Sequence, residues 1–144
     1  MKQLGLSDSA FAKHPKTTRK ARFLAEMDRV VPWERLKALI EPHYPKRGNG
    51  RPPFALETML RIHFMQHWFS YSDAAMEEAL HDIPLLRAFA AAVDAVPDET
   101  TILKFRRRLE RHQLAEAILF EVNALLTERG LILRQGTMVD ASLI

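Results

Sequence analysis

Apolar residues recur every three or four positions along most of this chain, which is the spacing of a helix face that packs against a core. This spacing restricts the fold more than any other property of the sequence. It predicts helices at residues 18–30, 32–39, 55–69, 73–82, 84–89, 99–112 and 114–129. With 144 residues the chain is long enough to bury one core without disulfides. We therefore expect a compact, mainly α-helical domain of several short helices.

One segment between the predicted helices is rich in residues that break secondary structure. Residues 41–54 contain four prolines and two glycines, so they are predicted to form a loop. The loop carries Lys46, Arg47 and Arg51. These side chains could contact phosphates, although a plain surface connector is the simpler interpretation.

Helix ends and helix faces can also be predicted. Ser70 or Ser72 is expected to cap the fourth predicted helix, Asp98 to cap the sixth, and Gly130 to end the last one. The residues expected in the core are Phe23, Leu24, Met27, Trp33, Leu36, Leu39, Leu85, Leu86, Phe89, Ile102, Phe105, Leu109, His112, Leu114, Ile118, Val122 and Leu125.

Two histidines stand four residues apart on the most apolar predicted helix. His63 and His67 have the spacing at which two imidazoles can share a metal ion. The sequence lacks the Glu of a zincin motif, has no cysteine and offers no third ligand nearby. We therefore expect packed core histidines rather than a metal site.

Positive charge is unevenly distributed, although the net charge is only +3. KHPKTTRKAR, from Lys13 to Arg22, has five Lys or Arg and no acid, and KFRRRLER, from Lys104 to Arg111, has five more against one Glu. Clustered cations suit a polyanion such as nucleic acid. The alternative is an ordinary solvated face of the protein.

The second cluster has a clear direction on its helix. If the apolar stripe of helix 99–112 faces the core, its cations face outward, with Arg106 at the edge. A basic helix that follows short helices suggests a helix-turn-helix-like segment that binds double-stranded DNA, although such a helix can equally bind RNA, an acidic partner or nothing. Thr100, Thr101 and the free amides of the first turn could be further phosphate donors, although Thr is also common at helix starts. The candidate DNA-binding residues are Lys104, Arg106, Arg107, Arg108, Arg111, Thr100, Thr101, Arg19, Lys20, Arg22 and Arg51.

After Gly130 the pattern changes from helical to β-type, and GTMVDASLI at residues 136–144 is predicted to be a strand. Asp140 stands inside this apolar run. A carboxylate in a central strand is costly unless it is hydrogen-bonded or binds a cation, so Asp140 is a candidate metal ligand. An exposed Asp at a strand end is the alternative.

Other classes of protein are excluded by composition. The absence of cysteine excludes a disulfide framework and thiolate metal sites. We find no leader segment and no apolar run long enough to span a bilayer, so we expect no membrane partner. The expected location is the cytoplasm, in association with the nucleoid when the protein is bound to DNA.

Four long stretches, in this order, carry a resemblance to a known family: PWERLKALIEPHYPK (32–46), GNGRPPFALETMLRIHFMQHWFSYSDAAMEEALHDIPLLRAFA (48–90), VPDETTILKFRRRLERHQL (96–114) and GTMVDASLI (136–144). In them the chain resembles the bacterial insertion-sequence transposases of the DDE class, in the group typified by the fifth insertion sequence. The family usually has VDAT where this chain has VDAS, with Ser142.

The resemblance implies two parts. Residues 1–135 would form a helical DNA-binding and dimerisation domain, and residues 136–144 the first strand of an incomplete RNase H-like catalytic domain. Asp140 would then be the first catalytic acid and a Mg²⁺ ligand, while the second Asp and the final Glu of the triad are missing. The chain alone is expected to hold no cofactor, to be inactive and to have no small-molecule substrate, whereas Mg²⁺ is implied for the intact enzyme.

Three hypotheses for function follow. The first is a transposase fragment that binds terminal inverted repeats. The second is a helical oligomerisation module, a homodimer whose basic helix contacts an acidic partner. The third is a regulator that inhibits full-length transposase by occupying DNA ends or by forming mixed dimers.

Overall fold

The computed structural model describes residues 16–130, and this part of the chain consists of helices joined by turns and loops, with no strand. The elements are α2 (Arg19–Val30), α3 (Trp33–Ile40), the 3₁₀ helix η1 (Glu41–His43), α4 (Leu56–Phe69), α5 (Asp73–Asp82), α6 (Pro84–Ala90), α7 (Glu99–Arg111) and α8 (Leu114–Glu128). The predicted mainly α-helical fold is confirmed. The predicted strand at 136–144 and Asp140 lie outside the described residues.

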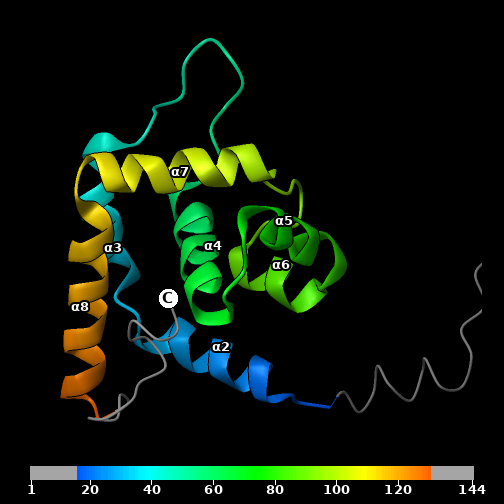
Figure 1. The fold of residues 1–144 in the computed structure, drawn as a ribbon, viewed down its shortest axis with the longest axis vertical. Helices are drawn as coiled ribbons and strands as arrows, with labels where there is room; N and C mark the ends of the chain where they lie inside the picture. Colours follow the sequence, from blue (N-terminus) through cyan, green and yellow to red (C-terminus); the bar gives the residue numbers. More distant parts are fainter. Residues whose placement is uncertain (1–15, 131–144) are drawn as a thin grey trace, which may run out of the picture.

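Helix α4 is the centre of the domain, and the other helices surround it (Figure 1). Nine of its fourteen residues are buried, on all sides of the helix. Helices α3 and α8 lie on one side of it, α5 and α6 on the other, and α7 crosses one end, while α2 lies at the opposite end. A helix that is apolar all round is expected at such a central position.

The predicted caps are observed where side-chain chemistry defines them. The hydroxyl of Ser72 accepts a hydrogen bond from the Ala75 amide at the start of α5, so Ser72 rather than Ser70 is the cap. Asp98 caps α7 through the Thr101 amide, with a distance of 2.8 Å. Gly130 follows the end of α8 with a φ of +70°, a conformation that glycine adopts without strain.

Leu39, Leu125 and His112 were predicted to lie in the core, but they are exposed or only half-buried. Leu39 is 40% exposed, and Ile40 is buried in its place because Ile40 stands two turns after Trp33 on the same face of α3. On α8 the buried positions advance by four residues per turn, so Leu126 follows Val122 inward and Leu125 is only half-buried. His112 is exposed because α7 ends at Arg111 and His112 is its C-cap.

His63 and His67 pack inside the domain, as predicted. His63 is buried, and its Nε2 lies 3.1 Å from Nε2 of the half-buried His67. No three His, Asp or Glu side chains within residues 16–130 form a group that could hold a metal ion. Within the same residues, no helix combines the length and apolar character needed to cross a bilayer.

Candidate nucleic-acid interface

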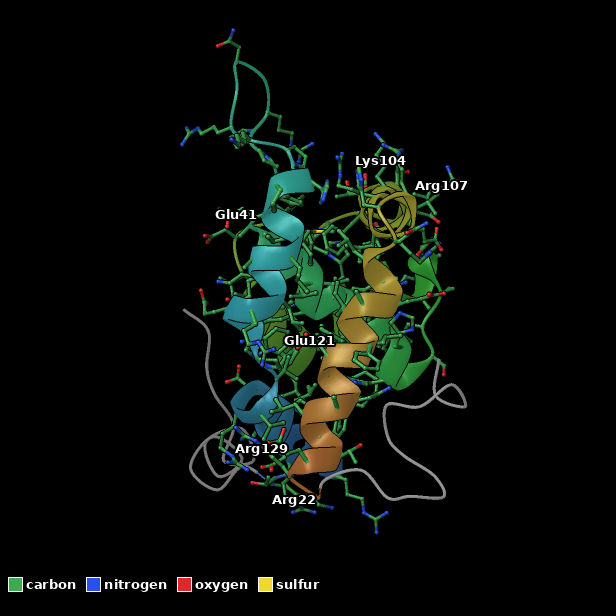
Figure 2. The ribbon with its side chains drawn as sticks, turned by 90° about the vertical axis from the view of Figure 1, so that its left-hand side faces the viewer. Arg22, Glu41, Lys104, Arg107, Glu121 and Arg129 are labelled. Atoms are coloured by element: carbon green, nitrogen blue, oxygen red, sulfur yellow. The ribbon has the colours of Figure 1, made fainter. Side chains whose placement is uncertain are left out.

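Helix α7 presents its basic face to solvent because its other face is fixed in the core. Ile102, Phe105 and Leu109 are buried, and α7 packs on α4, α5 and α8. Lys104 and Arg107 therefore point away from the domain, as Figure 2 shows, and both are exposed, as is Arg111. The outward orientation predicted from the helical wheel is confirmed for Lys104, Arg107 and Arg111, whereas Arg108 is half-buried.

Arg106 differs from its neighbours because a carboxylate within the domain binds it. Its guanidinium forms a two-bond pair with both carboxylate oxygens of Asp73 on α5, and Nη2 lies 2.9 Å from Oδ2. The Gln66 amide also donates to Asp73, at 2.9 Å. The hydrogen bond from Arg106 is the main reason why the pKa of Asp73 lies below its ordinary value. The pair between Arg106 and Asp73 thus connects α7 to α5.

Arg108 joins α7 to the turn that precedes the loop. Its Nη1 donates to the carbonyl oxygen of His43, at 3.0 Å. The His43 ring stacks on the ring of His112 with centroids 4.0 Å apart, so His112 contacts η1 instead of the core. Arg108 is half-buried and keeps the rest of its guanidinium for other contacts.

The start of α7 differs from the expectation of free amides. The Glu99 amide donates to Oε1 of Glu77 at 2.7 Å, and the Thr101 amide donates to Asp98. The hydrogen bond from the Thr101 amide is the main cause of the lowered pKa of Asp98. Because two carboxylates occupy these amides, the helix start is a poor place for a phosphate, and the prediction of free amides was wrong at Glu99 and Thr101. Thr100 is exposed and Thr101 half-buried.

The loop after η1 lies at the same end of the domain as α7 (Figure 1). The phenol of Tyr44 donates to the carbonyl oxygen of Phe54 and so ties the two ends of the loop together. The Tyr44 ring packs edge-on against Phe105 of α7, with centroids 6.0 Å apart. Burial raises the pKa of Tyr44 to about 12. The loop is therefore anchored to α7 by an aromatic contact.

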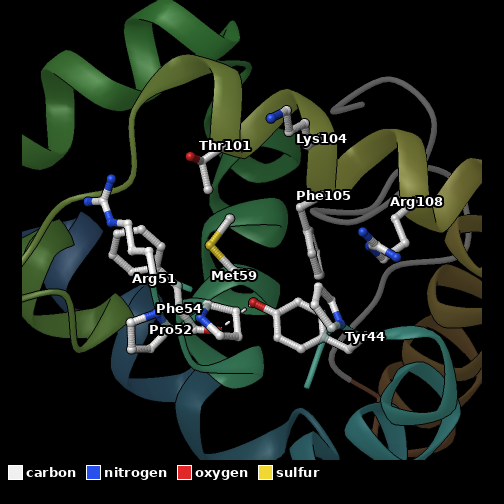
Figure 3. Close-up of a pocket in the computed structure, with 11 residues that line it drawn as sticks. Tyr44, Arg51, Pro52, Phe54, Met59, Thr101, Lys104, Phe105 and Arg108 are labelled. Carbon is white, nitrogen blue, oxygen red and sulfur yellow. Dashed lines mark hydrogen bonds between the residues drawn. The ribbon is translucent and has the colours of Figure 1, made fainter. Parts of the chain in front are cut away.

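A cleft of about 250 Å³ separates the loop from α7 (Figure 3). Arg51, Lys104 and Arg108 contribute to it from the two sides. Sequence analysis did not select Tyr44 and Phe54, although they flank a loop with three cations, which is a signal that could have identified them. The remaining lining residues are Pro45, Pro52, Pro53, Met59, Thr101 and Phe105.

The cations at this end share one property. Within residues 16–130, the ion pairs are formed by Arg29, Arg35, Lys37, Arg61 and Arg106. Seven cations on the loop and on α7 form none of these pairs, and we call this group the basic end. Its members are Lys46, Arg47, Arg51, Lys104, Arg107, Arg108 and Arg111. Cations that lack a carboxylate partner within the described chain remain available for an external anion.

The first basic cluster lies apart from the basic end. Arg19, Lys20 and Arg22 are on α2, at the end of the domain opposite α7 (Figure 1). Figure 2 places Arg22 and Arg129 at the end of the domain that is far from Lys104 and Arg107. The ammonium of Lys20 lies over the Phe69 ring, 4.8 Å from its centroid. The structure therefore brings Arg51 together with the α7 residues and separates the α2 residues from them.

Comparison with protein families gives a match. The model of the family described as Transposase domain (DUF772) matches residues 11–108, which span α2 to most of α7. No solved structure matches the chain. Because the match covers more than half of the sequence, including the loop and the first ten residues of α7, this chain belongs to the transposase domain (DUF772) family.

Proposed function

We propose that residues 16–130 are the DNA-binding domain of a DDE-class transposase of the group typified by the fifth insertion sequence. The basic end holds double-stranded DNA, and the α6–α7 segment acts as a helix-turn-helix-like unit. The observation that carries this proposal is the set of cations on the loop and α7 without an ion-pair partner in the described chain. The transposase family match supports it.

The geometry of α7 favours contact through its middle and its C-terminal half. Lys104, Arg107 and Arg111 follow one another at spacings of three and four residues, so they lie along one face of the helix. An α-helix fits the major groove of B-form DNA, and Lys and Arg contact phosphates or guanine edges from it. The carboxylates of Glu77 and Asp98 at the N-terminus keep that end of α7 away from the DNA backbone.

Residues of α2 take a secondary part in this proposal. Arg19, Lys20 and Arg22 would meet DNA as a separate contact, since they lie at the other end of the domain. Arg106 supports the interface by fixing α7 on α5. The target would be the terminal inverted repeats of a transposable element.

The resemblance at GTMVDASLI extends the proposal to a catalytic domain. Asp140 would be a ligand for Mg²⁺ together with acids that this sequence does not contain. Residues 16–130 offer no group of three carboxylates or histidines for such an ion. We therefore assign no step of catalysis to the helical domain.

An exposed aromatic residue favours a second candidate function. Phe120 on α8 is 74% exposed, and the exposed Ala117 and Ala124 lie one turn before and after it. Small residues around a large apolar one suit close packing against another helix. This face fits the alternative of an oligomerisation module that pairs with a second copy or with a full-length transposase and regulates it.

A gel shift with duplex DNA at physiological salt separates the two candidates. The DNA-binding proposal predicts a shifted complex whose affinity falls steeply as salt rises, because bound counterions are released from the phosphates. A protein that forms dimers in sedimentation but shifts no duplex at low or physiological salt would leave only the alternative. Phe120→Ser in the same sedimentation experiment tests the α8 face.

A further inference from the structure

The cleft between the loop and α7 combines an apolar interior with a positively charged rim. Its interior is apolar, with Met59 at the base and with the planes of the Tyr44 and Phe105 rings inclined at 75° to one another. Its rim carries Arg51, Lys104 and Arg108, and no Asp or Glu is among the residues that line it. Figure 3 shows Arg51 on the loop side of the apolar residues and Lys104 and Arg108 on the α7 side.

The charge at the rim selects for an anion. Hydrogen bonds from Thr101, followed by the positive charges of Arg51 and Lys104, lower the pKa of Asp98 outside the cleft lining. A larger hollow beside η1, of about 930 Å³, has Glu34, Glu41 and Glu57 in its lining together with Lys37, Lys46 and Arg47. The opposite charges offset one another there. The cleft at α7 is thus the hollow of the basic end whose lining carries cations without an acid.

The size and shape of the cleft suit a small flat ligand. About 250 Å³ lies just below the roughly 300–1,000 Å³ of pockets that hold drug-sized molecules. Aromatic and apolar walls bind a nucleobase by stacking, and Arg or Lys at the rim can bind the phosphate that follows it. The hydroxyls of Tyr44 and Thr101 are already hydrogen-bonded, to Phe54 and to Asp98, so a base would be held by stacking more than by hydrogen bonds.

We propose that this cleft binds one unpaired nucleotide of the DNA, with the base against the part-exposed Tyr44 and Phe54 and the adjoining phosphate at Arg51, Lys104 and Arg108. The inference rests on the proposed function, since the same basic end holds the duplex. Recognition depends on stacking more than on hydrogen bonds, so the preference among the four bases is weak. The domain would therefore favour DNA that is locally unpaired over DNA that is fully paired.

Two duplexes of the same sequence test this inference in the full chain. One contains a single unpaired 2-aminopurine as a bulge, and the other has that base paired with thymine. We expect roughly tenfold tighter binding to the bulged duplex by fluorescence anisotropy, from one base stacked on aromatic side chains. The bulged 2-aminopurine should also become protected from quenching by acrylamide.

A matched pair of variants locates the effect. Thr101→Phe fills the cleft from α7, and the ratio of the two affinities should fall to about one. Thr127→Phe makes the same chemical change at an exposed position of α8 and should keep the wild-type ratio. Circular dichroism verifies that both variants fold. If Thr101→Phe does not fold, Arg51→Ala in the exposed loop takes its place and should lower the ratio severalfold.

Each outcome has a definite meaning. Equal affinity for the two duplexes, or a 2-aminopurine that acrylamide quenches fully in the complex, overturns the nucleotide cleft and leaves the proposed duplex binding intact. A wild-type affinity ratio in Thr101→Phe overturns the cleft in the same way. Failure to bind either duplex overturns both proposals.

Discussion

Lowering the pH from 7 to 5 should destabilise the fold through His63. This side chain is only 2% exposed, and burial, followed by the charges of His67 and Arg106, lowers its pKa to about 3. In the unfolded chain its pKa returns to about 6.5. Between these two values the unfolded state binds more protons than the folded state, so stability falls as the pH drops below 6.5.

The magnitude follows from the two pKa values. Each pH unit in this window costs about 1.4 kcal/mol for one group. Between pH 6.5 and pH 5 His63 alone should therefore remove about 2 kcal/mol of the free energy of unfolding. His67 adds a loss in the same direction, because burial and Arg106 lower its pKa too. At pH 5 most carboxylates are still ionised, so acid titration of Asp and Glu contributes little.

Urea unfolding at pH 7 and pH 5 measures the effect, with tryptophan fluorescence as the signal. His63→Gln removes the titrating group and should reduce the loss between the two pH values by about 2 kcal/mol, whatever its effect at pH 7. The control is His81→Gln, since His81 is exposed on α5 and should leave the pH dependence as in the wild type. An equal pH dependence in wild type and His63→Gln would refute the reasoning.

Two further predictions concern stability. Arg106→Ala should lower the free energy of unfolding by about 1–3 kcal/mol because Asp73 loses both of its charged hydrogen bonds. The control is Arg35→Ala, whose pair with Glu121 is on the surface and should cost less than about 1 kcal/mol. Equal losses in urea unfolding would show that Arg106 does not join α7 to α5. Ala91→Gly should raise stability by about 0.5–1 kcal/mol, since Ala91 ends α6 with a φ of 58°, a left-handed conformation that strains a side chain. Ala88→Gly inside α6 should have the opposite sign, by about 1 kcal/mol, and a thermal melt in which Ala91→Gly also destabilises would contradict the strain.

Local features of the fold could be predicted from the sequence because they depend on neighbours in the chain. Asp98 caps α7 through a residue three positions ahead, and the stripe of Ile102, Phe105 and Leu109 follows from helical spacing. The outward direction of Lys104 and Arg107 follows from the same stripe. An ideal wheel fails at His112, since α7 has ended there.

Features that join distant parts of the chain could not be predicted. Arg106 and Asp73 are 33 positions apart, and nothing in the local pattern indicates that the helix edge meets α5. The cleft depends on how the loop folds back, which Tyr44 fixes by its contacts with Phe54 and Phe105. Charge spacing likewise could not show that the α2 cluster and the α7 cluster lie at opposite ends of the domain.

The salt dependence of duplex binding by Arg107→Ala tests most directly whether the basic end holds DNA. Arg107 is exposed on α7, and Arg129 is an exposed arginine at the opposite end of the domain. If Arg107 meets a phosphate, its removal weakens binding to all duplexes and lowers the slope of log affinity against log salt by about one. Arg129→Ala should keep the wild-type affinity and slope. Wild-type affinity and slope in Arg107→Ala, or the same loss in both variants, would contradict the assignment of the interface to α7.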